Sequence, residues 1–178
     1  MRRSRESVAR VRAWVLALVC TLSWGALAVP AKAVPSDLCS LLSPGQIGKA
    51  LGQPFLTPRT LPAPRAYHNT AAGTECDYLS QQPTGMGVPL KVVFIMYVES
   101  SPAAAKDAFA RTRPFAASFG PITPVAGLGD DAYRDANYAL HVLKGTAHYS
   151  INFIPMGTYT SKEDQQEKTL AAWVAGQL

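Results

Sequence analysis

Hydrophobic and polar residues alternate along two neighbouring segments near the C-terminal end of the chain, residues 138–143 and 147–154. Alternation with a period of two places the apolar side chains on one face of a β-strand. Because only residues 144–146 separate the two segments, we predict a β-hairpin.

Two registers fit this hairpin equally well. If residues 145–146 form its loop, His141 faces Ser150; if residues 144–145 form it, His141 faces His148. Both registers keep the apolar residues on one face, so the hydrophobic pattern does not select between them.

Other segments predict further strands. Residues 90–99 are apolar on both faces and rich in β-forming residues, which is typical of a central strand. Residues 75–80 predict another strand, and an acidic, strand-like stretch follows a tight turn at residues 127–129. The proline-rich residues 53–74 predict a long loop that holds at most one edge strand.

Three segments carry helix signals. Residues 44–51 follow a capping serine and precede a capping glycine. A second helix begins at Ser101–Pro102, and we expect Pro114 to end it. A third begins at Ser161 and carries an apolar stripe that includes Trp173.

These elements predict an α+β fold, with an antiparallel sheet of four to five strands covered by two or three helices. The chain has 178 residues and is 48% hydrophobic, which suits one globular domain. We assign residues 34–178 to that domain.

Residues 1–33 predict a signal peptide. An arginine-rich start precedes an uncharged, mostly apolar run from Ala13 to Val29, and we place cleavage after Ala33. The alternative is an uncleaved anchor. Cys20 follows Val19 rather than the small residue that lipoprotein processing requires. We therefore predict a periplasmic or secreted protein with no stable membrane span after cleavage.

Removal of the signal peptide also removes the net charge. The chain has 17 Lys and Arg against 12 Asp and Glu, and residues 1–33 hold six of the former and one of the latter. Eleven of each remain, so the domain is formally neutral. Its charge gives no support to nucleic-acid binding.

Two cysteines remain in the domain, Cys39 and Cys76. An even number of cysteines in an exported chain predicts a disulfide. The alternative is a pair of reactive or metal-binding thiols, but the chain has no C-x-x-C motif and no histidine at zinc-finger spacing.

A ligand site is predicted on the proline-rich loop. Arg65, Tyr67 and His68 lie there together, and such side chains contact acidic or aromatic ligands. The alternative is a solvated loop with incidental polar residues.

The second hairpin register predicts a metal site. It would place the imidazoles of His141 and His148 about 5 Å apart between their Cβ atoms, where they could share Zn or Cu. His68 is a candidate third ligand. The alternative is that both histidines are ordinary polar residues on the exposed face of a hairpin.

Enzyme signatures are weak. The chain has no G-x-S-x-G elbow for serine hydrolysis, and cysteine catalysis would need a free thiol. A hydrolase is compatible with the sequence only if its site is assembled in the fold.

Three short motifs resemble a known family: Cys39–Pro44 leading to Ala50–Gly52, then Cys76–Tyr78, then Gly127–Ala132. Together they span nearly all of the domain. They resemble small exported proteins and lipoproteins catalogued as domain of unknown function 3558. The resemblance implies an envelope domain of two helices and a sheet, and supplies no catalytic residues.

We therefore predict a non-enzymatic envelope or secreted domain that binds a partner or a small ligand through its proline-rich loop and the open face of its sheet. The alternatives are a metal-binding protein that uses His141 and His148, and a hydrolase.

Overall fold

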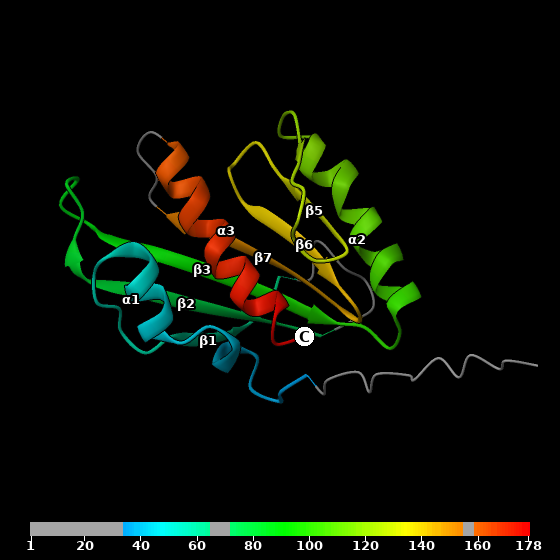
Figure 1. The fold of residues 1–178 in the computed structure, drawn as a ribbon, viewed down its shortest axis with the longest axis horizontal. Helices are drawn as coiled ribbons and strands as arrows, with labels where there is room; N and C mark the ends of the chain where they lie inside the picture. The colour runs from blue at the N-terminus through cyan, green and yellow to red at the C-terminus, as the bar shows by residue number, and fades with distance from the viewer. Residues whose placement is uncertain (1–33, 65–71, 155–158) are drawn as a thin grey trace, which may run out of the picture. The chain divides into compact units, whose positions relative to one another are not determined.

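One antiparallel sheet organises the chain in the computed structural model, which describes residues 34–64, 72–154 and 159–178. Within those ranges the sheet has seven strands in the order β1-β2-β3-β7-β6-β5-β4 (Figure 1). The strands are β1 (Arg59–Pro62), β2 (Gly73–Pro83), β3 (Pro89–Val98), β4 (Thr123–Pro124), β5 (Asp131–Arg134), β6 (Leu140–Lys144) and β7 (Ala147–Ile154).

The prediction of four to five strands is wrong in number. The two outermost strands, β1 and β4, are four and two residues long. Strand β1 lies within residues 53–74, where at most one edge strand is expected. The two residues of β4 are exposed and carry no alternating pattern by which the sequence could reveal them.

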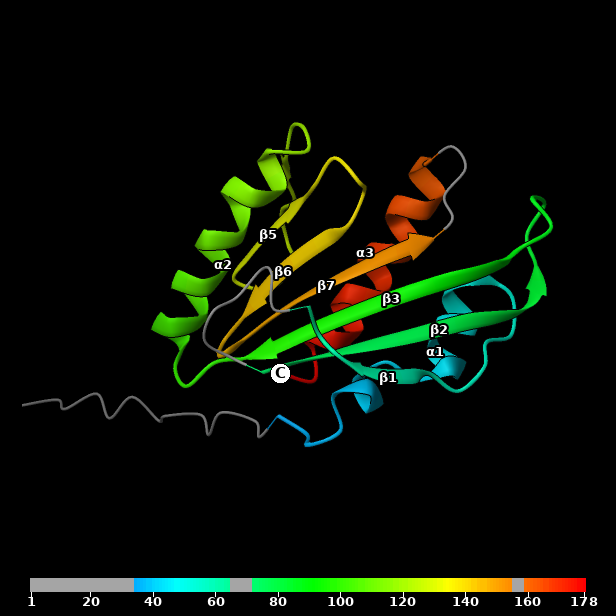
Figure 2. The same cartoon turned by 180° about the vertical axis from the view of Figure 1, so that it is seen from behind.

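The α+β class and the three predicted helices are confirmed: α1 (Pro44–Leu51), α2 (Pro102–Ala117) and α3 (Ser161–Ala175). A short 3-10 helix, η1 (Leu38–Leu41), precedes α1. Helices α1 and α3 lie together on one face of the sheet, in front of it in Figure 1 and behind it in Figure 2. Helix α2 packs on the opposite face, over β6 and β7. We call that opposite face the open face.

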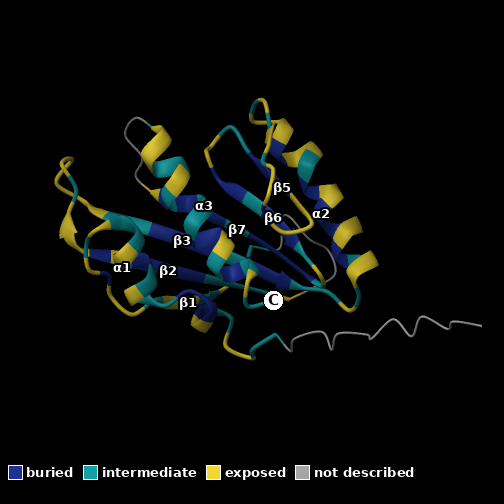
Figure 3. Ribbon diagram, viewed as in Figure 1, coloured by how far each residue is buried: buried dark blue, intermediate teal, exposed yellow. Residues whose placement is uncertain are grey.

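The main core lies between the sheet and the pair α1 and α3. Alternate residues of β3, namely Val92, Phe94 and Met96, are fully buried there with Leu170 of α3. A smaller cluster under α2 joins Phe109 to Tyr133 and Leu143. Figure 3 shows the buried residues along the central strands and on the sides of the helices that face the sheet.

Helix α1 has the bounds that its capping signals predict. The hydroxyl of Ser43 accepts a hydrogen bond from the backbone N–H of Gln46, and the Gln46 side chain accepts one from the N–H of Ser43. Gly52 ends the helix in the left-handed conformation, at φ 73°. Both ends are therefore fixed by local chemistry.

The prediction that Pro114 ends α2 is wrong, because the helix continues to Ala117. Proline removes one backbone hydrogen bond, to the carbonyl of residue 110. Pro114 and Ala110 are both exposed, so water can replace that bond. Ala116, one turn further on from Thr112, is buried in the cluster under α2, and this packing favours the extra turn.

The β6–β7 hairpin has the first of the two predicted registers. Lys144 pairs with Ala147, so residues 145–146 form the loop, and His141 faces Ser150. The carboxylate of Asp130 fixes this loop by accepting hydrogen bonds from the backbone N–H of Gly145 and from the Lys144 ammonium.

Strand β6 begins at Leu140, two residues later than predicted. Tyr138 has φ 65°, a left-handed conformation that an extended strand does not contain. It belongs to a turn in which its N–H donates to the carbonyl of Asp135. The Asp135 carboxylate accepts from the N–H groups of Asn137 and Ala139, which holds the turn in place.

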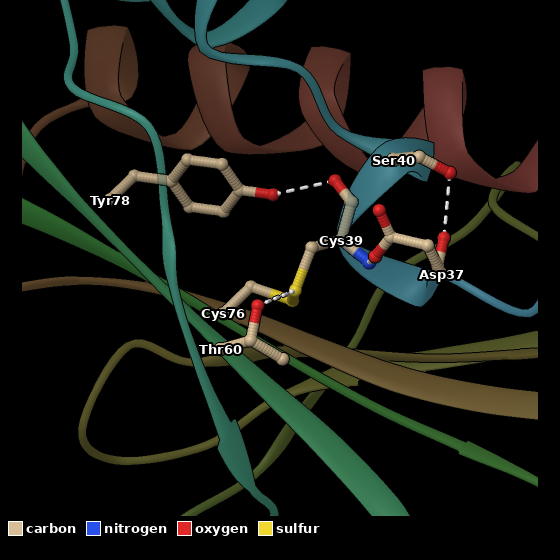
Figure 4. Close-up of a disulfide and its surroundings, with 6 residues drawn as sticks. All are labelled: Asp37, Cys39, Ser40, Thr60, Cys76 and Tyr78. Carbon is tan, nitrogen blue, oxygen red and sulfur yellow. Dashed lines mark hydrogen bonds between the residues drawn. A yellow bond between two sulfur atoms is a disulfide. The ribbon is translucent and has the colours of Figure 1, made fainter.

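The predicted disulfide between Cys39 and Cys76 is present and ties η1 to β2 (Figure 4). The hydroxyl of Tyr78 donates to the carbonyl of Cys39 at 2.9 Å, close to the disulfide. Because the bridged sulfur of Cys39 has no hydrogen, Thr60 donates its hydroxyl to that sulfur at 3.4 Å. The disulfide thus lies among contacts from β1, β2 and η1.

The described residues from Val34 onward belong to one compact unit. Within this part of the chain, no helix combines the length and the hydrophobicity needed to cross a bilayer.

Candidate functional site

A cavity of about 260 Å³ lies between α2 and the open face. On the helix side it is lined by three phenylalanines, Phe109, Phe115 and Phe119, which we call the aromatic wall. On the sheet side, Val93 and Ile95 lie beside four polar residues. We call these four the polar strip: His141, His148, Ser150 and Asn152.

The aromatic wall runs from the interior to the surface. Phe109 is 2% exposed, whereas Phe115 is 38% and Phe119 is 59% exposed. The rings of Phe115 and Phe119 pack edge to face, with centroids 5.0 Å apart. Large exposed aromatic side chains at the rim of a cavity are available to a ligand.

The register of the sheet brings the polar strip together. His148, Ser150 and Asn152 alternate along β7 with buried apolar residues, so their side chains share the open face. Strand β6 adds His141, which pairs directly with Ser150. The strip therefore crosses the centre of the sheet beneath the aromatic wall.

His141 is held by two contacts. Its Nε2 lies 3.0 Å from Oδ2 of Asp135, and its ring stacks on Tyr133 with centroids 4.6 Å apart. An ionised carboxylate only accepts hydrogen bonds, so Nε2 carries the hydrogen.

His148 is buried more deeply. Its ring stacks on Tyr97 with centroids 5.0 Å apart, and its Nε2 lies 3.5 Å from Oε1 of Glu99. Burial, with smaller electrostatic effects of His141 and Arg111, lowers the pKa of His148 to about 4. At neutral pH the ring is therefore uncharged.

Asn152 has an unused acceptor. Its Oδ1 is buried and accepts no hydrogen bond from the described residues. A buried polar atom without a partner costs about 1–3 kcal/mol. A ligand that donates a hydrogen bond to this oxygen would recover that free energy.

The predicted residues Arg65, Tyr67 and His68 lie outside the described residues. The last described residue before them, Pro64, accepts a hydrogen bond at 2.7 Å from the hydroxyl of Tyr97, which lines the cavity.

The predicted juxtaposition of His141 and His148 is not formed, because His141 faces Ser150 and His148 faces Leu143. The two histidines lie diagonally on the open face, and each has a ring nitrogen beside a carboxylate. Among the residues that the structure describes, no three His, Cys, Asp or Glu side chains are grouped to hold a metal ion.

If the cavity were the site of a hydrolase, Ser150 would be the nucleophile, His141 the base and Asp135 the group that orients the base. All three line the cavity. The Asp135 carboxylate contacts Nε2 of His141. In the described part of the chain, no hydrogen bond joins the Ser150 hydroxyl to His141. The contact between nucleophile and base that this chemistry uses is therefore not formed in the structure.

Sequence reasoning assigned none of Ser150, Asn152, Phe115 and Phe119 to a site. The alternation along β7 did contain a signal, because it placed Ser150 and Asn152 on the polar face of the hairpin. Nothing in the pattern indicated that a helix would lie over that face. Because Pro114 is expected to end the helix, the sequence does not place Phe115 on it.

In comparison with known proteins, no protein-family model and no curated protein matches this chain. The resemblance of the three short motifs to the exported family stays a prediction.

Proposed function

We propose that this chain is an exported, non-enzymatic domain that binds a small ligand in the cavity between α2 and the open face. The observation that carries the proposal is a cavity of about 260 Å³ that has the aromatic wall on one side and the polar strip on the other. Small-molecule sites are typically concave and mostly apolar, with a few convergent polar groups.

Two features support the export of the domain. The N-terminal residues have the composition of a signal peptide, and the disulfide joins the two cysteines that remain after cleavage. Disulfides persist in oxidising compartments outside the cytoplasm.

A fluorescence titration with 1-aminoanthracene, a small uncharged aromatic probe, tests the binding function. We expect saturable binding at one site per chain. Ala116 lines the cavity and Ala117 beside it is exposed, so Ala116→Leu fills the cavity and Ala117→Leu is the matched control. We expect Ala116→Leu to weaken binding by about tenfold, since it occupies the space of the probe.

Two results would contradict the binding function. One is the absence of saturable binding to the wild type. The other is equal binding by Ala116→Leu and the wild type, when thermal melting shows that both are folded.

Ester hydrolysis distinguishes binding from catalysis at the same site. With 4-nitrophenyl octanoate as substrate, we expect the same background rate for wild type and Ser150→Ala. Turnover by the wild type that Ser150→Ala abolishes would replace the binding function with a hydrolase.

A further inference from the structure

The polar strip leaves a hydrogen-bond acceptor open to a ligand. Nε2 of His141 is already turned to Asp135, at 3.0 Å from its Oδ2. Oδ1 of Asn152 is buried without a partner among the described residues. Ser150 adds a hydroxyl that can donate or accept. A ligand that donates a hydrogen bond suits this set.

The carboxylate of Asp135, which lines the cavity, is already hydrogen-bonded. Its Oδ1 accepts from the N–H groups of Asn137 and Ala139, and its Oδ2 lies 3.0 Å from Nε2 of His141. The stacked, buried ring of His148 is uncharged at neutral pH. Among the described residues that line the cavity, none is lysine or arginine. Burial of a charged group without a partner is unfavourable, so this environment favours an uncharged donor.

The opposite side of the cavity is apolar. Phe109 closes its inner end, whereas Phe115 and Phe119 form its exposed rim. The cavity volume of about 260 Å³ suits a small molecule.

We infer that the ligand is an uncharged alcohol or phenol, with its hydroxyl on the polar strip and its apolar part against the aromatic wall. The inference rests on the proposed binding function and adds the chemical class of the ligand. The hydroxyl donates to an acceptor of the strip, such as Oδ1 of Asn152, and can accept from Ser150.

Displacement of 1-aminoanthracene by three eight-carbon compounds at pH 7.5 tests the class. 1-Octanol, octanoate and octylammonium have the same apolar chain, so differences in affinity report the head group. We expect 1-octanol to compete at least about tenfold more strongly than either charged compound, since a charged head would lose its hydration without gaining a partner.

Variants of the strip locate the hydroxyl. Ser150→Ala with Asn152→Leu removes two polar groups while keeping the strand, and we expect 1-octanol to bind about tenfold more weakly, as for a lost buried hydrogen bond. Ser118→Ala, at the exposed end of α2, is the control and should bind 1-octanol as the wild type does. Unchanged 1-octanol affinity in the folded double variant would overturn the placement of the hydroxyl.

The remaining outcomes separate this inference from the binding function. If 1-aminoanthracene binds and octanoate or octylammonium displaces it as well as 1-octanol does, the ligand class is wrong and the cavity remains a binding site. If the probe binds and 1-octanol does not displace it, the class is again wrong. If the probe does not bind, both proposals are overturned.

Discussion

The environment of His148 makes the stability of the domain depend on pH. Its side chain is 4% exposed and stacks on Tyr97, and burial lowers its pKa from 6.5 to about 4. The unfolded state therefore binds more protons than the folded state between these two values. The contribution of His148 to stability therefore rises with pH across this window, and it is lost as pH falls below 6.5.

We expect the wild type to lose about 2 kcal/mol of unfolding free energy from this group between pH 6.5 and pH 5. His148→Gln does not titrate and keeps an N–H donor for Glu99, so its stability should fall less over that range. Urea unfolding followed by the fluorescence of Trp173 measures both. Equal losses in the variant and the wild type would show that His148 does not control this pH dependence.

A second prediction at the residue scale concerns Gly129. Its φ is 57°, and a Cβ at this position would lie 2.2 Å from the carbonyl oxygen of Leu143. Gly127 also has a positive φ, 80°, but a Cβ there would meet open space. We expect Gly127→Ala to cost about 1 kcal/mol and Gly129→Ala more than about 3 kcal/mol of stability in urea unfolding. Equal losses of stability in the two variants would mean that the backbone at residue 129 can move away from Leu143 without a loss of free energy.

At the scale of elements, the disulfide joins η1 to β2 across a sequence separation of 37 residues. A cross-link of this length reduces the entropy of the unfolded chain and is worth about 4 kcal/mol. We expect the double variant Cys39→Ser, Cys76→Ser to lose about this much stability in urea unfolding. Wild type reduced with dithiothreitol should match it. A loss below about 1 kcal/mol would contradict this account.

Elements with strong local signals could be predicted from the sequence. Helix α1 follows from its capping box, and the β6–β7 hairpin follows from alternation. The register of the hairpin could not be predicted, because Asp130 selects it through contacts with Lys144 and Gly145 that the hydrophobic pattern does not contain. The last turn of α2 depends on the tertiary packing of Ala116, which outweighs the local effect of Pro114.

At the scale of the whole molecule, the candidate site is formed by the way the strands and α2 are connected and packed. Residues from β3, β6, β7 and α2 meet at one cavity, although they are spread from Val93 to Ile154 along the chain. The sequence could show that Ser150 and Asn152 face away from the main core. Their position beneath Phe109 and Phe115 follows from the helix that connects β3 to the later strands, and no local pattern encodes that placement.

The N-terminal segment should be removed when the protein is exported. We expect a protein exported by its own leader to lose residues 1–33 and to begin at Val34. Its Cys39 and Cys76 thiols should be oxidised, so they should resist alkylation unless a reductant is added. Intact-mass measurement before and after reduction and alkylation tests both points. Retention of residues 1–33 in the exported protein would contradict the cleavage.

The most direct test of the central claim is to locate a bound molecule by nuclear magnetic resonance. In the complex of the labelled domain with 1-octanol, we expect intermolecular nuclear Overhauser effects from the octanol chain to Phe109 and Phe115. The side-chain amide of Asn152 should shift on binding. Contacts confined to exposed apolar residues elsewhere, such as Met86 and Val88, with no change at Asn152, would contradict the assignment of the cavity as the binding site.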